Sequence, residues 1–231
     1  MSQIPIFYAE LECVYAQTVA RGLRRLAVSA ANPGEGVSFL ARALARRGAA
    51  TGLRTLLMDF NSFHPADTAR GSWRPDGGSV RTAIVPIAAD GLDFVPASSL
   101  ASTDLSFRDP HRLRELLKEE LADYDLIIAD TSAVNRVNGR SVPPGVVAAA
   151  CDAAVLVILA GVTTGHAARV AAASLRESGA ELAGVVMNDR DNPMLVNELC
   201  REVERLRPFA PRLADWLERR LRGNALLRLH P

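Results

Sequence analysis

The sequence is poor in cysteine, and this scarcity excludes two classes of protein. Its 231 residues include three cysteines, Cys13, Cys151 and Cys200, which lie far apart and form no Cys-x-x-Cys pair. Neither a disulfide framework nor a zinc cluster fits this spacing. A reducing cytoplasm is the compartment that such cysteine usage favours.

An excess of one charge and a long apolar run are also missing. The 27 basic and 26 acidic residues leave a formal net charge of +1, which gives no strong nucleic-acid signal. The most apolar run, Ala153 to Val162, is too short to cross about 30 Å of hydrocarbon. Glu10 and Glu12 stand where a signal peptide would need an uninterrupted apolar stretch. We therefore expect a cytoplasmic protein in which nothing crosses a membrane.

Short apolar runs alternate with longer helical patterns along the chain. This order is typical of a doubly wound α/β fold, in which helices cover both faces of a mainly parallel sheet. The predicted strands are Leu26–Ser29, Thr55–Asp59, Leu92–Pro96, Leu126–Asp130, Ala154–Ala160 and Leu182–Met187. The predicted helices are Val37–Gly48, Arg112–Ala122 and Thr164–Ser178, with Gly48 and Gly179 as C-caps and Asp109-Pro110 as a helix entry.

The same patterns divide the chain into three parts. Residues 1–24 are predicted to form a helical arm, residues 25–192 the α/β domain, and residues 193–231 a helical, Arg-rich extension. Two stretches, Asn61–Ser79 and Thr131–Gly145, look irregular and directly follow predicted strands. Ligands of parallel sheets bind beyond the C-terminal ends of the strands, so we expect the functional site there.

A glycine-rich turn joins the first predicted strand to the first predicted helix. Its sequence is Ala31-Asn32-Pro33-Gly34-Glu35-Gly36-Val37-Ser38. Glycines let backbone N–H groups approach a phosphate, and the helix dipole favours negative charge. The spacing follows the phosphate-loop pattern G-x-x-x-x-G-K-[ST], with Ala31 at the first position and Val37 at the lysine position. The turn predicts a phosphate site that has lost its lysine.

Five motifs in order resemble one family. SAANPGEGVS, LLMDFNSFHP, GLDFVPAS, YDLIIADTS and GVVMNDR resemble the cytoplasmic ATPase domain of bacterial tyrosine autokinases, which act in capsule and exopolysaccharide production. These domains are similar in turn to the partitioning and division-site ATPases of the MinD/ParA type, which have deviant P-loops. The resemblance covers residues 10–192 and implies a P-loop NTPase-like fold.

The resemblance also implies the roles of individual residues. Ser38 is the expected magnesium ligand, Asp59 matches the first carboxylate of the second acidic motif, and Asp130 matches the carboxylate that holds magnesium through water. Asn188 matches an asparagine that contacts the adenine edge. Magnesium is usually held by one or two carboxylates plus substrate phosphates, so the chemistry is sound without the family. The implied phosphate loop comprises Asn32, Pro33, Gly34, Glu35, Gly36, Val37 and Ser38.

Several positions depart from the family pattern, and each departure weakens catalysis. Val37 removes the cation that neutralises the β- and γ-phosphates, and such a loss typically slows chemistry roughly 100- to 1,000-fold. Lys118 is the only lysine in the chain and is followed by two glutamates in a predicted exposed helix, so it is a poor replacement. Asn61 stands in place of a second Asp, and Ser132-Ala133 in place of two prolines.

Two assembly features of the family are absent as well. The C-terminal stretch contains no tyrosine, whereas the autokinases carry a tyrosine cluster there. The family's Glu-x-x-Arg-x-x-Arg helix corresponds here to Glu12–Thr18, which contains no arginine. We therefore do not expect autophosphorylation or ring assembly on the family plan.

Structural interpretations of the same residues stay open. The glycine-rich turn also fits a tight connection without ligand, and Asp59 and Asp130 also fit caps of loops at strand ends. Asn188 fits an Asx-turn, and Thr163-Thr164 fits a helix cap. Four histidines without metal-ligand spacing complete the set: His64, His111, His166 and His230.

The last part of the chain has an amphipathic and basic pattern. Residues 211–231 hold five arginines against Asp215 and Glu218, a balance of +3. The apolar residues at helical spacing are Leu213, Trp216, Leu217 and Leu221. Such a helix packs on the protein or a partner, or lies on an anionic membrane surface, and the pattern leaves these alternatives open.

The motifs and departures together predict an autokinase-like P-loop protein of polysaccharide biosynthesis or export. We interpret it as a regulator or partner of a membrane polysaccharide co-polymerase rather than an enzyme, with weak binding of ATP or ADP and Mg²⁺. One alternative is an active ATPase or tyrosine kinase that uses a non-lysine cation. Another is a MinD/ParA-like positioning ATPase. A homodimer and peripheral contact with the inner membrane face stay open.

Overall fold

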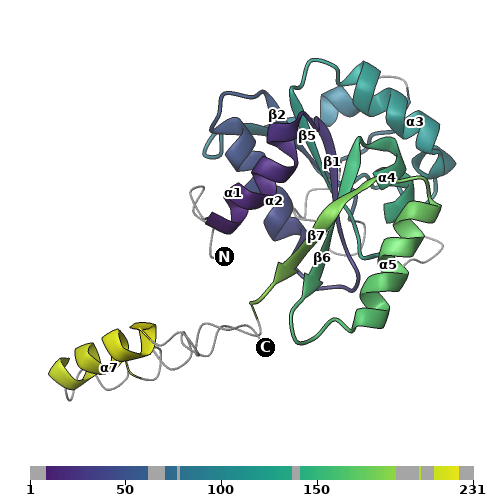
Figure 1. Ribbon diagram of the computed structural model, residues 1–231. Helices are drawn as coiled ribbons and strands as arrows, with labels where there is room; N and C mark the ends of the chain where they lie inside the picture. Colours follow the sequence, from purple (N-terminus) through teal and green to yellow (C-terminus); the bar gives the residue numbers. More distant parts are fainter. Residues whose placement is uncertain are drawn as a thin grey trace. The chain divides into compact units, whose positions relative to one another are not determined.

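The computed structural model describes residues 9–61, 71–76, 79–136, 141–190, 203 and 211–223. A seven-stranded sheet with helices on both faces forms the centre of the molecule (Figure 1). The strands are β1 (Arg25–Ala30), β2 (Thr55–Asp59), β3 (Val85–Ile87), β4 (Leu92–Val95), β5 (Leu126–Asp130), β6 (Ala153–Leu159) and β7 (Leu182–Asn188). The helices are α1 (Ala9–Gln17), α2 (Val37–Ala49), α3 (Pro110–Glu115), α4 (Pro144–Ala150), α5 (Gly165–Glu177) and α7 (Pro211–Gly223). Shorter helical segments are η1 (Val19–Arg21), η2 (Ser79–Ala83), η3 (Leu105–Arg108), η4 (Leu116–Glu120) and η5 (Val134–Arg136).

The strand order is β3-β4-β2-β5-β1-β6-β7, and all neighbouring pairs are parallel except β3 with β4. β1 lies between β5 and β6, so the first strand of the chain is an inner strand of the sheet. The C-terminal ends of the parallel strands meet at one edge, where the chain crosses from sheet to helix. The doubly wound α/β fold predicted from the sequence is confirmed.

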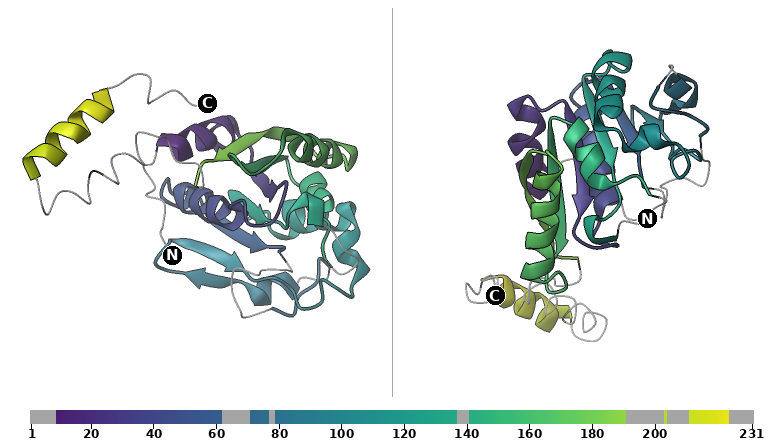
Figure 2. Two further views of the ribbon diagram at one scale, coloured as in Figure 1. Left: turned by 90° about the horizontal axis from the view of Figure 1, so that it is seen from below. Right: turned by 90° about the vertical axis from the view of Figure 1, so that its right-hand side faces the viewer.

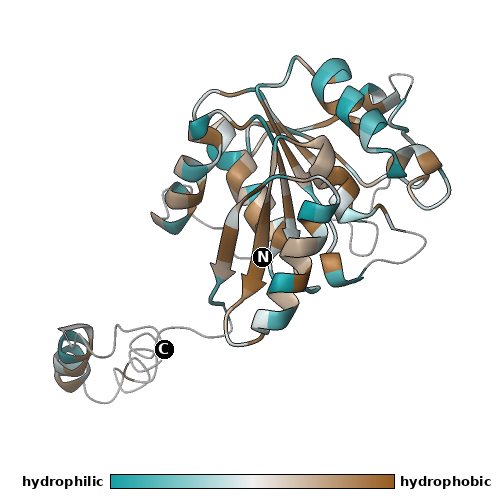
Figure 3. Ribbon diagram, turned by 45° about the vertical axis from the view of Figure 1, so that its right-hand side comes forward, coloured by the Kyte–Doolittle hydropathy of each residue, from teal (hydrophilic) through white to brown (hydrophobic). Residues whose placement is uncertain are grey.

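Helices α1 and α2 cover one face of the sheet, and α3, α4 and α5 cover the other (Figures 1 and 2). The inner strands are hydrophobic along most of their length (Figure 3). Successive strand residues point to opposite faces, so such strands place apolar residues on both faces of the sheet. The α2-side core includes Val28, Leu40, Leu44, Ile128 and Val155. The α5-side core includes Leu56, Met58, Leu113, Leu117 and Leu175.

The six strands expected from the apolar runs are all present, and β3 is an addition. Its three residues include Pro86 and are mostly exposed, so no apolar run marks it. It exists because β4 offers it an antiparallel partner at the sheet edge. The predicted irregular stretch Thr131–Gly145 includes the first two residues of α4, whose small apolar residues have no polar face and hence no helical period. The predicted stretch Asn61–Ser79 lies largely outside the described residues.

The predicted helices are present, with corrections to their ends. The helix expected over Arg112–Ala122 begins earlier, at Pro110 with Asp109 as its cap, and continues from α3 into a π-helical turn, η4. Gly48 is not a C-cap, because α2 continues to Ala49. A side chain on Gly48 would bring its Cβ to 2.4 Å from Cδ2 of Leu126, so close packing on β5 selects this glycine.

The N-terminal helix α1 is fixed to α2 by charge and by an aromatic contact. The carboxylate of Glu12 accepts hydrogen bonds from the Arg47 guanidinium, with Nη2 at 2.9 Å from Oε2. This guanidinium lies 4.6 Å from the ring centre of Tyr15 and lowers the pKa of Glu12 through its hydrogen bonds. The glutamate of the Glu12–Thr18 segment is thus engaged within the chain.

The chain divides after Asn188 into two compact units, the α/β unit and a second unit that holds residues 189–231 with residues 160–162. The described helix of the second unit, α7, exposes about half of Leu213 and of Trp216. The Arg220 guanidinium lies 5.4 Å from the Trp216 ring centre. No helix in the described part of the chain has the length and apolar character needed to cross a bilayer.

Candidate functional site

The turn between β1 and α2 has the backbone of an anion-binding loop. Gly34 and Gly36 adopt positive φ angles of 85° and 104°, a conformation that residues with a Cβ rarely take. At Gly36 a Cβ would also lie 2.7 Å from Nδ2 of Asn188. Gly36 is the N-cap of α2 and offers no side-chain cap, so the first N–H groups of the helix are left for a ligand.

Glu35 stabilises this loop through hydrogen bonds of its side chain and of its backbone carbonyl. Its side chain is buried, and Oε1 accepts hydrogen bonds from Nδ2 of Asn32 at 3.0 Å and from the hydroxyl of Thr163. The Glu35 carbonyl oxygen accepts from Nδ2 of Asn188 at 2.9 Å. The ends of β6 and β7 therefore hold the loop in shape without any contribution from residue 37.

Sequence reasoning missed the contact between Thr163 and Glu35. The threonine pair was expected to cap a helix, and Thr164 does so by accepting from the backbone N–H of Ala167 at 3.2 Å. Thr163 instead binds the loop glutamate, and its hydroxyl also accepts from the backbone N–H of Leu159. A threonine beside a capping threonine carries no sequence signal for such a long-range bond.

Val37 occupies the lysine position and is directed at the protein interior. Its side chain is partly buried and packs against the α2-side core. Lys118 lies at the opposite end of β1 from the loop. Its Nζ forms an ion pair of 3.1 Å with Asp152. The Asp152 carboxylate accepts from the backbone N–H of Arg25 at the start of β1, whereas the loop follows the end of β1. This position of Lys118 agrees with the prediction that it does not replace the missing lysine.

Asp59 and Asp130 lie side by side at the ends of β2 and β5. They are register partners, and both are almost completely buried. Ser38 at the start of α2 lies near Asp130, and its hydroxyl favours the ionised form of that carboxyl, which lowers its pKa. Burial, and then the negative charge of Asp59, raises the pKa of Asp130 to about 8. Asp59 also accepts from the backbone N–H of Asn61 at 2.7 Å, as expected of a cap at a strand end.

The donor set fits a magnesium ion that is shared with phosphates. Oδ1 of Asp130 is buried without a hydrogen-bond partner in the described structure, and so are Oε2 of Glu35 and Oγ of Ser132. The described residues contain no group of three or more His, Cys, Asp or Glu that could hold a metal ion alone. One or two carboxylates with a hydroxyl suit Mg²⁺, which takes its remaining ligands from water and phosphate. When bound, the ion would neutralise phosphate charge beside Ser38, Asp59 and Asp130.

An aromatic anchor lies directly beside the acid pair. Phe60 follows Asp59 and makes an edge-on contact with Trp73 at 5.9 Å between ring centres. Trp73 is fully buried, contacts Phe107 at 5.0 Å, and donates from Nε1 to the Pro96 carbonyl at 2.8 Å. This ring fixes residues 71–76 to the chain that follows β4.

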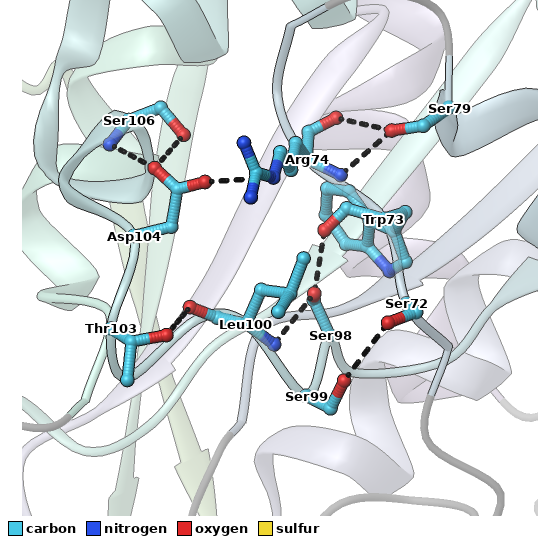
Figure 4. Close-up of polar contacts among 10 residues, drawn as sticks. All are labelled: Ser72, Trp73, Arg74, Ser79, Ser98, Ser99, Leu100, Thr103, Asp104 and Ser106. Carbon is cyan, nitrogen blue, oxygen red and sulfur yellow. Dashed lines mark hydrogen bonds and ion pairs between the residues drawn. The ribbon is translucent and has the colours of Figure 1, made fainter.

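Hydroxyl groups surround this anchor (Figure 4). Oγ of Ser98 donates to the Trp73 carbonyl at 2.6 Å, and Ser79 accepts from the backbone N–H of Arg74 at 2.9 Å. The Arg74 guanidinium pairs with Asp104 at 3.3 Å. The cluster uses its polar groups on one another and on the backbone, so its role is to hold residues 71–76 to the segment that follows β4.

The structure brings together the residues that the sequence singled out. The loop, Ser38, Asp59, Asp130 and Asn188 all lie at the C-terminal edge of the sheet. Asn135 in η5 joins them, because its Nδ2 donates to Oδ1 of Asn32 at 3.3 Å. The adenine contact of Asn188 stays a prediction. His64, His230 and Cys200 lie outside the described residues.

Comparisons with known proteins give relatives of one kind. No family model matches the chain. It is 26% identical over 176 residues to tyrosine-protein kinase CpsD of Streptococcus agalactiae, a match that covers 71% of this chain and 74% of the relative. It is 22% identical over 194 residues to tyrosine-protein kinase CpsD of Streptococcus pneumoniae, covering 80% and 84%.

Solved structures give the same fold. The kinase domain of Escherichia coli tyrosine kinase ETK matches with a TM-score of 0.63 at 20% identity and covers 81% of both chains. The septum site-determining protein MinD of Pyrococcus horikoshii, complexed with Mg-ADP, matches with a TM-score of 0.56 at 16% identity and covers 74% of this chain and 72% of its own. The chain thus contains a P-loop domain similar to bacterial tyrosine kinases and to MinD/ParA-like ATPases, with Val37 at the lysine position.

Proposed function

We propose that the chain is a tyrosine-kinase-like regulator of polysaccharide biosynthesis or export, and that it binds ATP or ADP without efficient turnover. Its partner in this proposal is the cytoplasmic end of a membrane polysaccharide co-polymerase. The relatives named tyrosine-protein kinase CpsD support the choice of process through the resemblance to capsule autokinases. Fold by itself does not fix function, so the site carries the rest.

One observation carries the regulatory part of the proposal. The loop is braced by Glu35, Thr163 and Asn188, while the position that should hold the catalytic cation holds a valine packed on the core. A loop of this kind retains backbone donors for phosphate and loses the charge that stabilises the transition state. The backbone donors of the loop still favour phosphate binding, whereas the missing charge is needed most in the transition state.

Calorimetry with ATP and with ADP, in the presence of Mg²⁺, tests the site. We expect the Val37→Lys variant to bind about tenfold or more tightly than wild type, because charge-assisted hydrogen bonds contribute about 1.5–3 kcal/mol each. Val37→Met is the matched control, since it adds length without charge and should give no gain. An ordinary rate of ATP hydrolysis by wild type, abolished in Asp130→Asn, would contradict the regulatory role.

A cellular measurement tests the process. Deleting the gene in its own host should reduce the amount or the chain length of a surface polysaccharide, and the wild-type gene should restore it. The purified chain should bind a peptide from the cytoplasmic end of the co-polymerase. Unchanged polysaccharide after deletion would remove the assignment to this process.

A second candidate is an active ATPase or tyrosine kinase with a cation other than lysine. It is favoured by the carboxylates that remain at the site, since Asp59 and Asp130 are neighbours at the ends of β2 and β5 with Ser38 nearby. Under this candidate the wild-type chain hydrolyses ATP, and the rate depends on an arginine and on Asp130. The two candidates therefore give opposite results in one hydrolysis assay.

A further inference from the structure

The two edges of the sheet differ in how they are protected. The edge of a sheet presents unpaired backbone N–H and C=O groups, and proteins protect it with short strands, prolines or charged side chains. β3, at one edge, is three residues long and contains Pro86, whereas β7 lies at the opposite edge (Figure 2). β7 is seven residues long, and its sequence over Leu182–Asn188 contains neither proline nor charge. Within the described ranges, no strand other than β6 pairs with β7, so its outer edge is open to a further strand.

Two large apolar side chains of β7 are exposed on one face of this edge. Val185 is 51% exposed, and Met187 is 67% exposed. Their partners in β6, Leu156 and Ile158, pack in or against the α5-side core, so both side chains stand on the α5 side of the sheet. The pairing with β6 is regular over residues 184–188, because its one register shift comes before them.

The spacing of these two side chains makes the edge complementary to itself. If a second copy pairs antiparallel about Val186, Val185 of each copy lies directly opposite Met187 of the other. Side chains directly opposite each other on one face of an antiparallel pair are in contact. Gly184 then lies opposite Asn188, and there is room beside this glycine, since a Cβ on it would meet no other atom within 4 Å. One pairing register therefore covers the large exposed apolar side chains of both edges.

We propose that β7 is a dimerisation edge, through which two copies of this chain pair antiparallel about Val186 and form one continuous sheet. The occupant is a second copy because the strand matches its own reverse, a property that no other partner needs. The interface is small, since one strand pair buries less than the about 1,200 Å² of a standard interface, so the dimer should dissociate on dilution. Neither nucleotide nor the proposed co-polymerase takes part in this pairing.

Sedimentation velocity of the full chain without nucleotide, over a range of protein concentrations, tests the dimer. Wild type should shift from monomer to dimer as its concentration rises. Val185→Lys should raise the dissociation constant of the dimer at least about tenfold, because each contact with Met187 would bury a lysine charge. Val85→Lys is the matched control and should leave the constant unchanged, since Val85 is 52% exposed and lies in β3 at the opposite edge.

Disulfide cross-linking tests the register. Residues directly opposite in an antiparallel pair have Cα atoms about 4.5–5.5 Å apart, which a disulfide can bridge, whereas diagonal neighbours are about 7–8 Å apart. A mixture of the Val185→Cys and Met187→Cys variants should therefore form a covalent dimer under mild oxidation. Each variant alone should form at least about tenfold less, because identical positions are diagonal in this register. Wild type oxidised in parallel measures the contribution of the native cysteines.

The outcomes separate this edge from any other dimer contact. A wild-type chain that stays monomeric at every concentration overturns the proposal. A dimer that Val185→Lys leaves intact, or that Val185→Lys and Val85→Lys weaken equally, overturns it as well. Equal cross-linking of the mixture and of the single variants overturns the register about Val186. Met187→Lys replaces Val185→Lys if that variant does not fold, and circular dichroism verifies the fold of each variant.

Discussion

At the scale of one residue, the buried carboxyl of Asp130 makes the free energy of unfolding depend on pH. Burial together with the charge of Asp59 raises its pKa to about 8, far above its ordinary value of 3.8. Between these pH values the folded protein holds a proton that the unfolded chain releases. The free energy of unfolding therefore falls as the pH rises from about 4 to about 8, by at most about 1.4 kcal/mol per pH unit from this group.

Asp130→Asn should remove this pH dependence. In EDTA, urea unfolding at pH 5, 6.5 and 8 should show the variant gaining stability over wild type with each step. Asp123→Asn is the control, because Arg81 lowers the pKa of Asp123 and this carboxylate is ionised throughout the range in both states. Parallel pH profiles of wild type and Asp130→Asn would show that the Asp130 carboxyl is not held protonated.

At the scale of elements, two contacts fix segments of the scaffold: α2 on β5, and residues 71–76 on the segment after β4. Gly48 lets α2 pack closely on β5, and this packing helps to fix the position of α2, which begins at the loop. Trp73 holds residues 71–76 against the segment after β4, beside Phe60. Both contacts lie away from the loop, so changes in them test the scaffold rather than the chemistry.

Gly48→Ala should destabilise the protein although alanine favours helices. The added Cβ would overlap Leu126, and overpacking costs about 1–3 kcal/mol, against a helix propensity gain of about 1 kcal/mol. Gly165→Ala is the matched control, because its Cβ would make an ordinary contact of 3.5 Å with Nη1 of Arg169. Urea denaturation measures both, and equal stability of the two variants would contradict the close packing.

Trp73→Ala should lower the free energy of unfolding by about 3–5 kcal/mol, as expected for the loss of a fully buried aromatic ring. Trp73→Phe keeps an aromatic ring and leaves the Pro96 carbonyl without its donor, which should cost about 1–3 kcal/mol. Circular dichroism during urea unfolding measures both variants. Ser99→Ala should change little, because its hydroxyl makes only an exposed contact of 3.4 Å with Ser72 among the bonds of this cluster.

At the scale of the whole α/β unit, one sheet connects two cores. Each central strand sends side chains to both the α2-side core and the α5-side core, as Ala27 and Val28 do in β1. Neither core can lose its strands while the other keeps them. The unit should therefore unfold in one cooperative transition.

Leu44→Ala and Leu113→Ala should each lower the free energy of unfolding in this single transition by about 2–5 kcal/mol. Both side chains are fully buried, and they lie in opposite cores. Their effects should add to within about 0.5 kcal/mol in the double variant, since the sheet separates the two sites. Circular dichroism and tryptophan fluorescence during urea unfolding should give the same midpoint. Separate transitions for the two variants would show that the cores unfold independently.

The sequence by itself determined six of the seven strands, the helices that follow them most regularly, and a glycine-rich turn with valine at the lysine position. Continuous apolar runs report strands buried on both faces, and glycines directly before a helix report a turn with exposed backbone N–H groups, so both patterns are local. Asp59, Asp130 and Asn188 could be placed at one sheet edge for the same reason, because they end predicted parallel strands.

Only the tertiary structure decided what these residues contact. The bond from Thr163 to Glu35 spans 128 positions, and the packing of Val37 depends on the helix and strands that form the α2-side core. β3 likewise exists only because β4 pairs with it. Such contacts follow from which distant segments the fold brings together, and no local pattern of residues records that.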